Sequence, residues 1–176
     1  GYRTEHSLMI AAIATSIAKE IEWESDTTAS KLVMAAFFHD IMIDKDIEEL
    51  ALMDDPRAQM ARDERLEKFL VHAQKANEML NELSGLPSDV TSIIACHHEK
   101  ADGSGFPQHL DWKKIPPLAA IFIVAEDYTD CVYNSGLELF NMQDILEDLE
   151  SKYTKGNFKK AVKGLRSALA FPLIEE

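Results

Sequence analysis

Apolar residues recur at three- and four-residue spacing along most of the chain, a pattern typical of amphipathic helices. In residues 4–23 this pattern is formed by Leu8, Met9, Ile10, Ile13, Ile17 and Ile21. Comparable patterns predict helices over residues 31–40, 63–83, 87–98, 117–133, 137–153 and 158–171. No segment shows the alternation that a half-buried strand requires, so the sequence predicts an all-α bundle of about seven helices.

Residues that favour helix ends separate these segments. Ser25 offers an N-cap side chain before the second helix, and Gly85 follows the third. A short acidic helix or loop is expected over residues 44–55, with a break at the pair Asp55-Pro56. A chain of 176 residues suits one domain, which we expect to cover residues 1–176.

Charge limits the partners of this domain. The 176 residues contain 31 Asp and Glu against 18 Lys and Arg, a formal net charge of -13. Such a surface argues against coating DNA or RNA, because phosphate binding depends on Lys and Arg. An anionic substrate would therefore need the help of bound cations.

Other features bear on location and cysteine chemistry. The sequence has no apolar run of transmembrane length and no signal peptide, so we expect a soluble, cytoplasmic protein without a membrane segment. Cys96 and Cys131 lack CxxC spacing, which indicates neither a disulfide framework nor a structural zinc site. Because Gly1 already lies inside a helical pattern, the chain is expected to be a domain of a longer protein.

Five of the six histidines lie on apolar helix faces or at helix ends: His6, His39, His72, His97 and His98. One core histidine alone is usually a packing residue, but burying five imidazoles without partners would cost considerable desolvation energy. Neutral imidazole is the commonest metal ligand, and carboxylates complement it. The candidate carboxylates are Asp40, beside His39, and Asp127, which interrupts an otherwise apolar run.

The segment from His97 to Pro107 joins the histidine pair to an acidic loop broken by Gly103 and Gly105 and closed by Phe106. Two adjacent imidazoles at a helix end point about 100° apart, so they suit a cavity that holds two ions. The glycines allow the backbone to turn tightly where a Cβ would clash. The segment therefore indicates a metal site bordered by a loop of defined shape, which we call the lip.

In this order, the histidines and the His-His-Glu-x-x-Asp-Gly-x-Gly-Phe-Pro string resemble the HD-GYP branch of the HD-domain metal-dependent phosphohydrolases. The likeness extends from about Arg3 to Val132. It implies an all-α HD fold that binds two divalent ions, iron or manganese, and hydrolyses cyclic di-GMP, a cyclic dinucleotide, as an output domain in bacterial signalling. An N-terminal regulatory domain in the full protein is also implied.

The resemblance assigns roles by position. One ion is expected to be held by His6, His39, Asp40 and Asp127, and the other by His72, His97 and His98, with Asp40 bridging. A metal-bound water would attack phosphorus in line. The segment beginning at Pro117 favours Asp127 over Glu126, although a gap-free register from the histidine pair would favour Glu126. The lip residues expected to bind substrate are Asp102, Gly103, Ser104, Gly105 and Phe106.

The sequence also departs from the family. Ile43 stands where members usually have a lysine near the substrate phosphate, and Phe106 replaces the tyrosine that names the motif. Tyr2 replaces a glutamate that some members use for a third ion. These changes leave open a catalytically weak or inactive module that binds metal and nucleotide. A di-iron oxygenase or oxygen sensor is a further alternative, because histidine-rich di-iron sites serve either chemistry. The two C-terminal helices are expected to complete the core or to form a homodimer contact.

Overall fold

The computed structural model describes residues 2–53, 57, 63–135 and 142–169. Within these ranges the regular elements are eight α-helices and one 3-10 helix, which confirms the all-α prediction. They are α1 (Tyr2–Glu20), α2 (Asp26–Phe38), η1 (Glu48–Leu52), α4 (Arg65–Leu70), α5 (His72–Asn81), α6 (Ser88–Cys96), α7 (Pro117–Asn134), α8 (Met142–Lys152) and α9 (Gly156–Leu169).

Several predicted boundaries differ from those of the structure. The helix expected over 63–83 is two helices, α4 and α5, because Val71 has ψ near -1° and interrupts the regular turn between them. The helix expected over 87–98 ends at Cys96, so the histidine pair follows it. Ser25 caps α2 as predicted and accepts a hydrogen bond from the backbone N–H of Thr28 at 3.0 Å. The Asp55-Pro56 break and the outer ends of the helices predicted over 137–153 and 158–171 lie outside the described residues.

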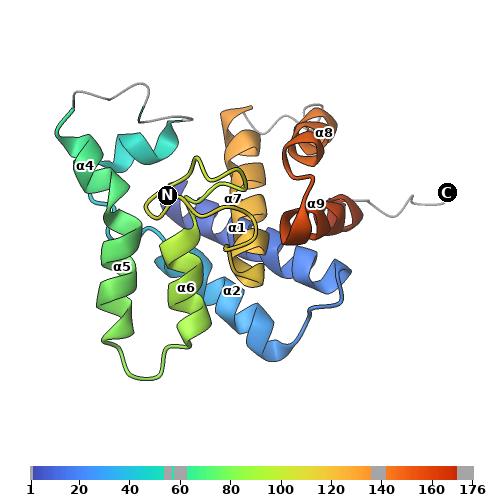
Figure 1. Cartoon of the computed structure of the whole chain (residues 1–176), viewed down its shortest axis with the longest axis horizontal. Coiled ribbons are helices and arrows are strands. Elements are labelled where there is room, and N and C mark those ends of the chain that lie inside the picture. Colours follow the sequence, from blue (N-terminus) through green and yellow to red (C-terminus); the bar gives the residue numbers. More distant parts are fainter. Residues whose placement is uncertain (1, 54–56, 58–62, 136–141, 170–176) are drawn as a thin grey trace.

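Helix α7 is the centre of the core. Its residues from Ala119 to Ala125 are all buried, as expected for a helix that is apolar on every side. Figure 1 shows α7 between α4, α5 and α6 on one side and α8 and α9 on the other. Helix α7 therefore lies between two groups of helices.

Helix α1 packs against α2, α7 and α9. Its contact with α9 is close because a Cβ at Gly164 would lie 2.7 Å from a methyl group of Ile21 and 3.1 Å from the Ile17 carbonyl oxygen. A small second cluster of Ile43, Ile47, Leu50 and Phe69 joins the segment after α2 to α4. Phe106, in the loop that follows α6, packs against this second cluster.

Candidate metal centre

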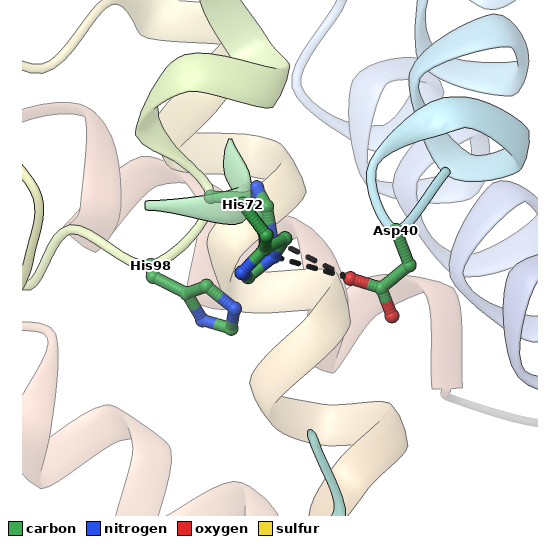
Figure 2. Close-up of side chains that lie close together, drawn as sticks. Asp40, His72 and His98 are labelled. Carbon is green, nitrogen blue, oxygen red and sulfur yellow. Dashed lines mark hydrogen bonds and ion pairs between the residues drawn. The ribbon is translucent and has the colours of Figure 1, made fainter. Parts of the chain in front are cut away.

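Three helix ends carry most of the candidate ligands. His39 and Asp40 follow α2, His72 is the first residue of α5, and His97 and His98 follow α6. Figure 2 shows Asp40 directed from the end of α2 toward His72, with His98 beside them. Segments far apart in the sequence thus place their polar groups in one small volume.

The tightest group consists of Asp40, His72, His97 and His98, each of which offers a ligand atom within 4.8 Å of the others. Asp40 Oδ1 lies 3.4 Å from Nε2 of His72 and 3.8 Å from Nε2 of His97. Asp40 Oδ2 lies 3.2 Å from Nε2 of His39 on the other side. One carboxylate therefore faces two sets of histidines, as a bridging ligand would.

A second group lies beyond His39. Its Nε2 is 3.7 Å from Glu126 Oε1, and the His6 ring is 5.8 Å from the His39 ring, measured between centroids. His6 Nε2 is 2.7 Å from Asp130 Oδ1. Glu126 and Asp130 are four residues apart, so they share one face of α7. This face of α7 supplies two carboxylates to the histidines of α1 and α2.

Asp127 has a different position from the one predicted. Its carboxylate accepts hydrogen bonds from Lys152 and from the Tyr153 hydroxyl, whereas Glu126 faces His39. Adjacent residues on a helix point about 100° apart, so only one of the two can face the histidines. The structure places Glu126, and not Asp127, beside His39, and the gap-free register from the histidine pair agrees with this arrangement.

The orientation of three histidine rings favours a bound cation. The Nδ1 atoms of His39, His72 and His97 lie 2.9, 2.5 and 2.6 Å from backbone carbonyl oxygens, so each must carry a proton and donate it. In the neutral rings Nε2 then has only a lone pair. The Nε2 atoms of His72 and His97 face each other at 3.2 Å beside a carboxylate. Two facing lone pairs and a carboxylate repel one another. A bound cation would remove this repulsion, so the residues fit a metal ion.

The pKa values of His97, His98 and Asp40 agree with ligand roles, whereas the pKa of His39 is raised, because the effect of burial is outweighed by the adjacent Asp40 carboxylate. Burial, with neighbouring His72 and His39, lowers the pKa of His97 to about 3. Burial and His97 also hold the pKa of His98 well below its usual value. Burial opposes ionisation of Asp40, but His39, His72 and His97 outweigh it and keep the Asp40 pKa well below normal. Uncharged imidazoles and an ionised carboxylate are the forms that bind metal.

His98 differs from these three histidines, because its ring is held by aromatic contacts. Its Nε2 atom is buried and has no hydrogen-bond partner among the described residues. The Phe106 ring stacks on it at 4.6 Å between centroids and an interplanar angle of 25°, and Phe69 packs at 5.4 Å. The direction of this Nε2 atom therefore depends on ring packing.

The loop after His98 is folded tightly so that Phe106 returns to it. The Phe106 N–H donates to the His98 carbonyl oxygen at 3.0 Å. Buried Glu99 accepts hydrogen bonds from the N–H groups of Gln108 and Leu110 at 2.7 and 2.8 Å. A Cβ at Gly105 would lie 2.3 Å from the Lys100 nitrogen, so the loop requires glycine there.

A cavity of about 360 Å³ opens beside His97 and His98. Its lining includes His97, His98, Glu126 and Asp130, and also Phe106 from the predicted lip. The other four lip residues predicted to bind substrate, Asp102, Gly103, Ser104 and Gly105, are not among the lining residues. Asp102 instead accepts hydrogen bonds from the N–H and hydroxyl of Ser104, at 2.9 and 2.6 Å, within the loop itself.

The cavity also has lining residues for which sequence analysis predicted no chemical role. Asp148, Leu149, Lys152 and Tyr153 bring α8 and the residue after it to this wall. Helical periodicity predicted α8 but gave no sign that its end reaches the histidines. Ile43 does not line this cavity; it is buried in the small apolar cluster with Phe69 and presents no charge.

The chain is similar to known proteins in sequence and in fold. The model of the HD domain family matches residues 2–159. Among solved structures, Bd1817, an HDG"Y"P protein from Bdellovibrio bacteriovorus, has a similar fold, with a TM-score of 0.73 and 18% sequence identity. The likeness covers 95% of this chain and 52% of the Bd1817 chain, so this chain spans about half of that protein. No curated protein sequence matches at a significant level. None of the helices described by the structure is long and apolar enough to cross a membrane.

Proposed function

This chain belongs to the HD domain family, and from that premise we propose that it is a metal-dependent phosphodiesterase that hydrolyses cyclic di-GMP or a related short nucleotide. The observation that supports this most strongly is the close group of Asp40, His72, His97 and His98, of which His97 and His98 line the cavity. Buried imidazoles beside an ionised carboxylate are typical of sites that bind divalent ions and act on phosphate esters.

We assign two ions, iron or manganese, to two sets of ligands. His72, His97 and His98 would hold one ion, and His6 and His39 would hold the other together with Glu126, which replaces Asp127 in this assignment. Asp40 faces both sets of histidines and is the proposed bridge. When bound, such ions supply an activated water near neutral pH and stabilise charge on the phosphoryl oxygens.

The protein contributes orientation and charge. Backbone carbonyl groups fix the rings of His39, His72 and His97, so their Nε2 atoms stay directed into the site. The low pKa values of His97 and His98 keep these rings unprotonated at physiological pH, so protons do not compete with the ions. The Glu126 pKa is raised well above normal by burial and by Asp130 and Asp40, which disfavours three adjacent negative charges until a cation arrives.

A second candidate function is a module that binds metal and nucleotide with little or no turnover. The observation that favours it is Ile43, which is buried in an apolar cluster where the resemblance leads one to expect a lysine. Such a module would use the same cavity to sense a cyclic dinucleotide and pass the signal to another part of a longer protein. An N-terminal regulatory domain and a homodimer contact remain predictions.

One experiment separates these candidates. The domain is purified without oxygen, iron and manganese are counted per chain, and cyclic di-GMP, linear pGpG and a simple phosphodiester are followed over time. Two bound ions with hydrolysis of cyclic di-GMP would support the phosphodiesterase. Two ions, tight nucleotide binding and no hydrolysis would favour the sensing module. Absence of bound metal under all conditions would contradict both.

A further inference from the structure

The cavity has an acidic wall that an anionic substrate must approach. On this side, α7 contributes Glu126, Asp127 and Asp130, and α8 contributes Asp148. Bound metal ions would offset the carboxylates that face the histidines, but not Asp127 or Asp148, which lie toward α8. Among the described residues, three cations line the cavity, Arg57, Lys100 and Lys152, and of these only Lys152 comes from α7 or α8. Lys152 is therefore the candidate partner for an anion bound at the acidic wall.

The position of Lys152 is fixed by a buried neighbour. Its ammonium group and the Tyr153 hydroxyl both donate to the same oxygen of Asp127. Tyr153 is only 1% exposed, and its ring stacks on Phe158 at 5.0 Å between centroids. The Lys152 ammonium also lies 5.0 Å from the centre of the Tyr153 ring, within the range of a cation–π contact. These contacts hold the charge at the cavity wall while 44% of the Lys152 side chain remains exposed.

A cyclic dinucleotide carries two phosphate groups, and the metal site can engage only the one that is attacked. The other needs a cation at a distance from the ions, since an unpaired phosphate beside the acidic wall would be repelled. We infer that Lys152 binds the phosphate that is not attacked, with Asp127 and Tyr153 as positioning residues. This inference rests on the proposed function, and it supplies from α8 a phosphate contact that Ile43 cannot make.

The direct test measures nucleotide binding without turnover. In isothermal titration calorimetry, the metal-loaded domain is titrated with a hydrolysis-resistant phosphorothioate analogue of cyclic di-GMP. Lys152→Gln should weaken binding about tenfold or more, because a charge-assisted hydrogen bond to phosphate is lost. Lys155→Gln is the matched control: it removes the same charge three residues away, at an exposed lysine that does not line the cavity. Lys152→Arg keeps the charge and should retain most of the affinity.

A kinetic comparison tests the distance from the metal site. For cyclic di-GMP, Lys152→Gln should raise KM with little change in kcat, whereas KM for bis(p-nitrophenyl) phosphate, which has a single phosphate, should not change. Equal loss with both substrates would overturn the inference, because Lys152 would then act at the attacked phosphate. Thermal unfolding confirms that each variant is folded.

The two proposals fail in different ways. If the parent domain binds the analogue and Lys152→Gln binds it equally well, the inference about Lys152 is wrong and the proposed function stands. If the metal-loaded parent domain neither binds nor hydrolyses cyclic dinucleotides, both are wrong. A loss of affinity in Lys155→Gln as large as that in Lys152→Gln would show a general charge effect and would also overturn the inference.

Discussion

Replacing Phe106 with leucine tests how the protein orients His98. The Phe106 ring stacks on the His98 ring at 4.6 Å, and the buried Nε2 atom of His98 has no hydrogen-bond partner among the described residues. Phe106→Leu keeps much of the apolar volume but removes the flat surface. The imidazole can then rotate away from the direction in which it would bind an ion.

The size of the effect follows from the contacts. A stacked aromatic pair contributes about 0.5–1.5 kcal/mol beyond the burial of its area. Changing a group that orients a metal ligand usually lowers metal affinity about 10- to 100-fold. Since about 1.4 kcal/mol corresponds to a factor of ten, we expect Phe106→Leu to weaken the binding of one ion about tenfold. The ion assigned to His6 and His39 should be retained.

Manganese titration of the chelator-treated domain, followed by electron paramagnetic resonance, measures this loss. Phe106→Tyr is the matched control, because it keeps the ring and should bind manganese as the parent does. Thermal unfolding in EDTA should show that both variants are folded without metal. Equal manganese affinity of the leucine variant and the parent would refute the role of Phe106, and so would a tyrosine variant as weak as the leucine variant.

Three further predictions concern neighbouring residues. Glu126→Gln should lower the metal content measured by mass spectrometry and Asp127→Asn should not, because only Glu126 faces His39; the reverse result would restore Asp127 as the ligand. Gly105→Ala should lower the free energy of unfolding in urea by about 1–3 kcal/mol, because the new Cβ would overlap the backbone, and an unchanged midpoint would show that the loop relaxes. Without metal, the folded state should lose about 2 kcal/mol through His97 between pH 6.5 and 5, since the unfolded chain takes up a proton that folded His97, with a pKa of about 3, does not. His97→Asn should therefore lose less stability on acidification over this range than the parent. An equal loss would show that His97 is not responsible for this pH dependence of stability.

Helical periodicity predicted the elements well, because it depends on which residues are apolar within a few turns. It missed the interruption at Val71, which makes His72 the first residue of a new helix. It also extended the helix before His97 by two residues, to His98. Both differences lie at helix ends beside the candidate site, where contacts with other elements determine the backbone conformation.

The fold class and most of the cluster follow from the amino-acid pattern alone. Its five histidines and Asp40 stand on helix faces or at helix ends, and any compact packing of amphipathic helices brings such buried polar groups together. The specific His-His-Glu loop indicated which packing to expect, and the family match agrees with it. These features are local or depend on spacing along the chain, so they can be found without coordinates.

The packing of the helices sets which carboxylate faces the histidines and which residues surround them. A rotation of about 100° separates Glu126 from Asp127, and the packing of α7 against α1 and α8 sets that rotation. The same packing brings Lys152 to the cavity wall, although no pattern in α8 marks it. These outcomes depend on contacts between distant segments, and a periodicity of 3.6 residues per turn does not specify which segments meet.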